Sequence, residues 1–154
     1  MPIKNVSPRE AKELLDSEEG YIYLDVRSVP EFISGHPQGA VNIPLLDIDP
    51  VLRQMVPNPD FLAVVEANFP KDTKLIVGCQ SGMRSARAVE ILQQAGYTHI
   101  VHMQAGFGGM RDPFGRVSQP GWSQLQLPIS TDNGEGVSYE SLATKAREKN
   151  KKNK

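Results

Sequence analysis

The chain alternates between stretches in which apolar residues recur at helical spacing and short, mostly apolar runs typical of strands. Residues 7–10 read Ser-Pro-Arg-Glu, a capping box with proline at the first helical position, and an apolar stripe of Ala11, Leu14 and Leu15 follows it. Residues 21–26 are mostly apolar and rich in β-formers, as expected of a strand buried on both faces. A helix followed by a buried strand is thus the first predicted unit.

Further helices and strands follow a loop at residues 28–44 that is rich in proline and glycine. The other predicted elements are an extended piece at 40–43, helices at 45–56, from Asn58 onwards and at 85–95, and strands at 75–77 and 99–103. Strands separated by helices favour an α/β fold, a parallel sheet with helices on both faces. Sites in such sheets form beyond the carboxyl ends of the strands. Asp25, Cys79 and Gln104 fall at or just after such ends, so we expect them to converge.

Composition and charge limit the classes of function. The chain has 154 residues, a single cysteine and a formal net charge of -1. This size fits one domain with a proper core, and the charge gives no sign of nucleic-acid binding. No apolar run opens the chain, and none approaches the ~18 residues that a membrane span needs. A single cysteine excludes an internal disulfide. These features favour a cytoplasmic location, with neither a membrane nor nucleic acid as a partner.

The segment after Pro128 has no core pattern apart from a weak helical one at residues 138–149. Residues 145–154 carry six basic side chains against one acidic side chain, a sum of +5. We therefore predict a domain at residues 1–128, followed at 129–154 by a polar, basic and flexible extension.

Cys79 is the strongest candidate for a reactive residue. An apolar run ends at this cysteine, and a polar turn of Gln80, Ser81 and Gly82 leads to Arg84 and a helix. Backbone N–H groups in such a turn point at the sulfur, and the helix dipole favours negative charge there. Both effects favour a thiolate, the nucleophilic form of cysteine, so we expect Cys79 in an electropositive and partly exposed site.

The histidines indicate neither a metal site nor a general base beside Cys79. His99 and His102 lie three apart on a predicted strand, so they face opposite sides of the sheet and cannot share an ion. His36 is expected to hydrogen-bond within its own loop. The glycine-rich residues 106–109 lack the dinucleotide pattern and better fit the rim of a pocket. We expect no metal and no other cofactor.

Several separated motifs resemble the rhodanese family in the same order and spacing. They are Asp25-Val26-Arg27, Glu31-Phe32, Gly35-His36, Gly39–Pro44 and Val77–Ser85. The likeness covers about residues 3–128 and is closest to the single-domain thiosulfate sulfurtransferases. It implies a five-stranded parallel α/β domain with Cys79 as the sulfur acceptor. By the same likeness, the active-site loop consists of Gln80, Ser81, Gly82, Met83 and Arg84, and its supporting residues are Asp25, Arg27 and Glu31.

The chain departs from the family pattern in three places. Residues 37–39 read Pro-Gln-Gly where the family often has Ile-Pro-Gly, and Met110 stands where it often has tryptophan. An extra segment at 111–121 then follows the last predicted strand. We expect this segment near the Cys79 turn. The proposed pocket rim consists of Phe107, Arg111 and Arg116, with Phe114 as a further wall. Its arginines would steer anionic donors. The alternative is an exposed insertion without a catalytic role.

The resemblance implies a sulfurtransferase that forms a Cys79 persulfide. It would take sulfane sulfur from thiosulfate or a persulfide and pass it to cyanide or a thiol. The donor or acceptor could itself be a protein. One alternative is a non-catalytic sulfur carrier or protein-binding module. A cysteine phosphatase or arsenate reductase on the same fold fits less well, because the related phosphatase loop is one residue longer than the four residues between Cys79 and Arg84.

Overall fold

A parallel sheet of five short strands forms the centre of the protein in the computed structural model, which describes residues 3–152. The strands are β1 (Lys4–Val6), β2 (Ile22–Asp25), β4 (Val41–Asn42), β7 (Leu75–Gly78) and β8 (Ile100–Met103), in the order β1-β8-β7-β2-β4. All neighbouring pairs in this sheet are parallel. The expected α/β class with a five-stranded parallel sheet is therefore confirmed.

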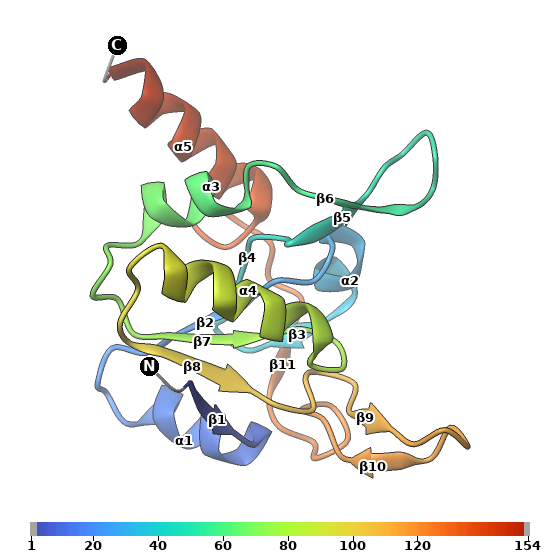
Figure 1. The fold of residues 1–154 in the computed structure, drawn as a ribbon. Helices are drawn as coiled ribbons and strands as arrows, with labels where there is room; N and C mark the ends of the chain where they lie inside the picture. Colours follow the sequence, from blue (N-terminus) through green and yellow to red (C-terminus); the bar gives the residue numbers. More distant parts are fainter. Residues whose placement is uncertain (1–2, 153–154) are drawn as a thin grey trace.

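Helices cover both faces of the sheet (Figure 1). They are α1 (Pro8–Asp16), α2 (Val29–Ser34), α3 (Phe61–Asn68), α4 (Met83–Gln94) and α5 (Tyr139–Lys152). Helices α3, α4 and α5 lie on one face and α1 on the other. Successive side chains of a strand point to opposite faces. Leu24 of β2 is therefore buried with the first group of helices, whereas Tyr23 is buried with α1 and Trp122.

Two helices begin with the same capping box. The Ser7 hydroxyl accepts from the Glu10 N–H and the Glu10 carboxylate accepts from the Ser7 N–H, as the sequence predicts. Ser28 and Glu31 repeat this arrangement at the start of α2, inside a segment that the sequence analysis treats as a loop. The spacing of Ser28 and Glu31 is that of a capping box, so it could have indicated the start of α2 in the sequence.

The helix expected at residues 45–56 is wrong. This segment forms an antiparallel hairpin of β5 (Leu46–Ile48) and β6 (Met55–Pro57). Pro50 has no N–H to offer a helix, and the Asp49 carboxylate accepts from the N–H groups of Val51 and Leu52, at 2.9 Å each. These bonds reverse the chain before a helix can continue.

Two further short antiparallel pairs lie outside the main sheet. β3 (His36–Pro37) pairs with β11 (Ile129–Ser130), and β9 (Met110–Arg111) pairs with β10 (Val117–Gln119). The second pair forms a hairpin that extends from the same side of the molecule as the tips of β7 and β8 (Figure 1). The first pair ties the chain beyond Pro128 to the loop after α2.

The chain beyond Pro128 also contributes to the main core. Helix α5 packs against α3, and its Leu142 and Ala146 are 5% and 6% exposed. The Asn68 side-chain amide donates to the Leu142 carbonyl at 3.0 Å, which fixes the two helices together. The weak helical pattern at 138–149 therefore marks a packed helix. A domain boundary at residue 128 stays a prediction. No helix of the described residues 3–152 has the length and apolar character to cross a membrane.

Candidate active site

Cys79 follows the last residue of β7 and precedes α4, whose N-cap is Gly82. The Gly82 N–H donates to the Cys79 sulfur at 3.1 Å, so the turn aims at least one backbone donor at that atom. Gly82 has φ of 105°, a left-handed conformation that glycine adopts without strain. Cys79 is only 1% exposed, less than the sequence analysis expects. Very little of Cys79 is therefore in contact with solvent.

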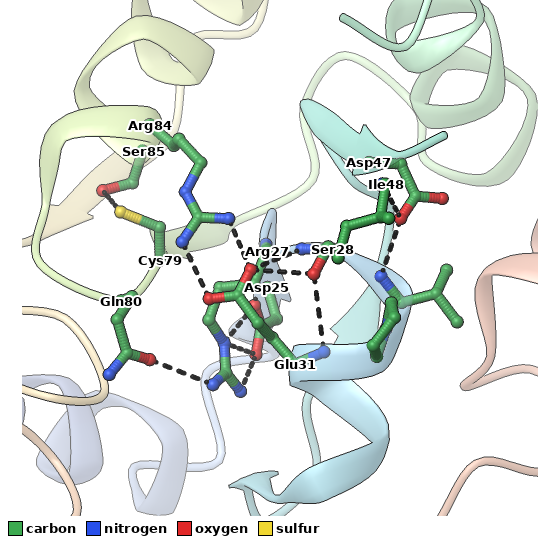
Figure 2. A network of polar contacts seen from close by, with 12 residues as sticks. Asp25, Arg27, Ser28, Glu31, Asp47, Ile48, Cys79, Gln80, Arg84 and Ser85 are labelled. Atoms are coloured by element: carbon green, nitrogen blue, oxygen red, sulfur yellow. Dashed lines mark hydrogen bonds and ion pairs between the residues drawn. The ribbon is translucent and has the colours of Figure 1, made fainter. Parts of the chain in front are cut away.

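A buried ion pair supports the start of the Cys79 loop. The Arg27 guanidinium contacts both carboxylate oxygens of Asp25, the shortest distance being 2.8 Å, and the two residues are 3% and 1% exposed. Arg27 Nη1 also lies 3.3 Å from Gln80 Oε1 (Figure 2). Burial alone would lower the pKa of Arg27, but the Asp25 carboxylate outweighs it and raises that pKa. Arg27 therefore remains charged and can donate a hydrogen bond to the side chain of Gln80, the residue next to Cys79.

A second ion pair supports the end of the loop. Arg84 donates two hydrogen bonds to the Glu31 carboxylate, at 2.7 and 2.9 Å, which joins α4 to α2 (Figure 2). Burial would raise the pKa of Glu31, but hydrogen bonds from Arg84 and Ser28 outweigh it and lower the pKa to about 2. The same pairing raises the pKa of Arg84. Arg27 thus contacts the start of the loop and Glu31 its end, and the supporting role of Asp25, Arg27 and Glu31 stays a prediction.

The glycine-rich segment 106–109 packs directly on the loop. The N–H groups of Phe107 and Gly108 donate to the carbonyls of Cys79 and Gln80, at 2.8 and 2.9 Å. A Cβ at Gly106 would lie 2.5 Å from the Cys79 carbonyl oxygen, so the contact requires glycine. The Phe107 ring lies 4.5 Å from the Arg27 guanidinium. Phe107 therefore lies beside the loop, and its role as a rim residue stays a prediction.

The other candidate residues are more loosely connected to the sulfur. Met83 is 81% exposed and Ser81 is half-buried. Arg111 and Arg116 lie on the β9–β10 hairpin, where Arg111 donates to the Gly115 carbonyl and Arg116 is 78% exposed. Their role as a rim stays a prediction. The side chain of Gln104 is exposed, and its backbone N–H bonds to β1.

A chain of hydrogen bonds behind Cys79 has no counterpart in the sequence analysis. The Cys79 sulfur lies 3.3 Å from the Ser85 hydroxyl, which lies 2.8 Å from His102 Nε2. His102 Nδ1 in turn lies 3.1 Å from the Asn5 amide oxygen. These residues come from β1, α4 and β8 and the end of β7, so no local motif joins them. The pairing of β7 with β8 brings His102 beside Ser85, and the pairing of β1 with β8 brings Asn5 to His102. The order of strands in the sheet was therefore the missing information, and β1 itself is not predicted.

His36 bonds within its own segment, as expected. Its ring is buried, stacks on Phe32 with centroids 3.7 Å apart, and its Nδ1 lies 2.8 Å from the Phe32 carbonyl oxygen. The ring therefore packs α2 against the strand that follows it.

The profile of the Rhodanese-like domain family matches residues 7–112, which include the Cys79 loop and both ion pairs. The chain belongs to the rhodanese-like domain family. Thiosulfate sulfurtransferase 16, chloroplastic, of Arabidopsis thaliana is 41% identical over 124 residues, covering 80% of this chain and 90% of that protein. Rhodanese-like domain-containing protein 15, chloroplastic, from the same plant is 37% identical over 125 residues, covering 81% of this chain.

The rhodanese-like relatives differ in length. The present chain spans 60% of the Arabidopsis protein 15 and of the Raphanus sativus protein DIN1, so those proteins contain further sequence. Among solved structures, Rv0390 from M. tuberculosis matches with a TM-score of 0.71 at 27% identity, covering 86% of this chain and 100% of that one. The rhodanese-like fold therefore extends over most of the present chain.

Proposed function

We propose that this protein is a sulfurtransferase that carries sulfane sulfur on Cys79. The observation that carries the proposal is the position of the cysteine. It directly follows β7 and accepts from the Gly82 N–H, in a loop that buried or half-buried ion pairs contact at both ends. A fixed donor stabilises negative charge on sulfur without reorganisation. Relatives named thiosulfate sulfurtransferase support thiosulfate as a donor.

The proposed reaction has two balanced steps. The Cys79 thiolate attacks the outer sulfur of thiosulfate, the sulfur–sulfur bond of thiosulfate breaks, and sulfite leaves with the electron pair. Cyanide or a thiolate then attacks the outer sulfur of the Cys79 persulfide, and the Cys79 thiolate leaves. On the protein, the negative charge is carried first by the Cys79 thiolate and then by its persulfide, and the Gly82 N–H donor at the Cys79 sulfur supports this proposal.

Intact-mass measurement tests this function. Incubation with thiosulfate should add the mass of one sulfur atom, and cyanide should remove it while thiocyanate appears. The Cys79→Ser variant should show no gain. An unchanged mass for the wild type, or a gain that survives in Cys79→Ser, would contradict the proposal.

A non-catalytic sulfur carrier or a protein-binding module is the main alternative. A carrier would also gain one sulfur atom, so the mass experiment alone does not separate the two. Continuous turnover of thiosulfate and cyanide separates them, because a carrier without an external partner stops after one equivalent. More than one equivalent of thiocyanate per Cys79 supports the enzyme.

A cysteine phosphatase or arsenate reductase is the lesser alternative. The four residues between Cys79 and Arg84 leave a smaller loop than a tetrahedral oxyanion needs, and the Arg84 guanidinium is already paired with Glu31. Hydrolysis of an aryl phosphate or reduction of arsenate that is lost in Cys79→Ser would favour this alternative instead.

The physiological partners follow from the same chemistry. We propose a small anionic sulfur donor and a thiol or cyanide acceptor, with a protein persulfide or thiol as a further candidate for either. The chain contains a single cysteine, so no second thiol of its own can resolve the persulfide. A cytoplasmic location stays a prediction, because relatives named chloroplastic occur among the matches.

A further inference from the structure

The geometry points to a proton relay in which Ser85 and His102 take the proton of Cys79 when its thiolate forms. The relay deepens the function proposed above, because that function needs the thiolate. Ser85 touches the reacting sulfur, and His102 acts through Ser85. His102 therefore supplies a general base for Cys79 that no residue near it in the sequence provides.

The direction of the relay follows from its last contact. The Asn5 side-chain oxygen, 3.1 Å from His102 Nδ1, can only accept a hydrogen bond, so the proton of the neutral ring resides on Nδ1. His102 Nε2 is then an acceptor, and the Ser85 hydroxyl donates to it at 2.8 Å. The Ser85 oxygen is left to accept from the Cys79 thiol at 3.3 Å. The three hydrogen bonds, donated by Cys79, Ser85 and His102, therefore all run from the sulfur toward Asn5.

Transfer along this chain balances without any other reactant. The Cys79 S–H bond breaks and its proton joins the Ser85 oxygen, while the Ser85 proton moves to His102 Nε2. The products are a thiolate and an imidazolium, with the Ser85 hydroxyl between them. The thiolate then accepts from Ser85 and from the Gly82 N–H, which is 3.1 Å away. The Gly82 carbonyl, also 3.1 Å from Ser85, is a competing acceptor, but the His102 contact is the shorter.

The surroundings of His102 suit a neutral acceptor. Burial lowers the pKa of His102, and contact with the Gly82 backbone acts in the opposite direction. Burial therefore favours the neutral ring, the form that can accept a proton, and opposes the imidazolium, so attraction to the Cys79 thiolate has to stabilise the proton on His102. The groups that hydrogen-bond to it are Asn5 from β1 and Ser85 from α4, both uncharged. Cys79 is the titratable group at the other end of the relay. Asn5 is exposed, so the far end of the relay is close to solvent.

Alkylation of Cys79 by iodoacetamide tests the relay without any sulfur donor. This neutral reagent reports the thiolate fraction, so the result stands apart from the outcome of the persulfide experiment. The rate is followed by intact mass between about pH 6 and 9.5. Ser85→Ala and His102→Gln should react about fivefold or more slowly than wild type near pH 7 and equally fast near pH 9.5, where the thiolate forms without help. His99→Gln, an exposed histidine on the same segment, should match wild type throughout.

The pH profile separates a relay from a structural role. Profiles identical to wild type in Ser85→Ala and His102→Gln would overturn the relay. A rate lowered by one constant factor at every pH would also overturn it, because that pattern reports altered access to the sulfur. Ser85→Thr keeps the hydroxyl and should recover the wild-type profile. If His102→Gln fails to fold, Asn5→Ala replaces it as the test, because Asn5 is exposed. Its alkylation rate near pH 7 should also be lower than that of wild type. A pH profile equal to wild type in Asn5→Ala would count against the relay.

Discussion

Glu31 ties α2 to the Cys79 loop through a charge that depends on pH. Its pKa, lowered to about 2 by Arg84 and Ser28 against the effect of burial, lies well below the ordinary 4.5. A carboxylate with a depressed folded-state pKa adds stability above its ordinary pKa and loses that contribution as the pH falls toward the folded value. The relevant window is therefore between about pH 4.5 and 2.

Glu31→Gln should lower the melting temperature most near pH 7. Hydrogen bonds between charged groups contribute about 1.5–3 kcal/mol, so we expect a loss of about 3 °C or more. The gap to wild type should narrow as the pH falls from about 5 to 3. Glu90→Gln is the matched control, because Glu90 pairs with Arg87 on the surface, where both are more than 60% exposed. Calorimetry that shows a gap independent of pH would contradict this account.

The role of a residue could be predicted from the sequence where the residues that define this role are neighbours in the chain. Cys79 could be identified because its strand, turn and helix are contiguous, and Ser28 with Glu31 carried a capping signature. The contacts of Arg84 with Glu31 and of His102 with Ser85 join segments 53 and 17 residues apart. Only the order of the strands in the sheet brings such residues together, and a single sequence does not state that order.

At the scale of elements, the β9–β10 hairpin is the part of the chain whose role is least constrained. Asp112 accepts from the N–H groups of Phe114 and Arg116, at 2.9 Å each, which shapes the turn. The Phe114 ring is 81% exposed. Arg111 and Arg116 of the hairpin are exposed as well, so their charges lie in solvent. There they act on a ligand at a distance, and salt weakens the interaction.

Arg111→Ala combined with Arg116→Ala should raise KM for thiosulfate if the hairpin steers the donor. We expect an increase of about twofold or more at low ionic strength and a smaller one at high ionic strength. Lys145→Ala with Arg147→Ala removes the same charge from α5 and should leave KM unchanged. Steady-state kinetics with KM equal to wild type at low salt would make the hairpin an exposed insertion without a role in donor binding.

Helices and strands were predicted correctly where the hydrophobic periodicity was clear. The prediction failed where side-chain hydrogen bonds to the backbone determine the local structure. The strands at β2, β7 and β8 and the helices α1, α3 and α4 follow their hydrophobic patterns. Residues 45–56 contain enough apolar positions for a helix, but Pro50 and the Asp49 side chain impose a turn. β1 has three residues, too few for a periodic pattern to be visible.

At the scale of the whole molecule, α5 completes a core that the sequence places entirely before residue 129. Its apolar stripe of Tyr139, Leu142, Ala143 and Ala146 is weak because it contains only one large aliphatic side chain and is followed by basic residues. The partner surface, α3, supplies the burial that the pattern of α5 alone does not reveal. Packing against α3 thus stabilises a helix in a segment whose composition alone favours a solvated tail.

Leu142→Ala should lower the free energy of unfolding by about 2 kcal/mol or more, since it removes a buried side chain from the core. Thr144→Ala, at an exposed position of the same helix, should change it little. Urea denaturation measures both. A Leu142→Ala value within about 0.5 kcal/mol of wild type would mean that α5 is detached in solution.

The late position of α5 in the chain has a consequence during synthesis. Every strand of the sheet leaves the ribosome before α5 does, while the part of α3 that packs against α5 has no cover. Domains fold as units, and partly folded chains with exposed apolar surface are prone to aggregate. A nascent chain paused before residue 139 is therefore a target for chaperones and proteases, and messages truncated in this region should yield little protein.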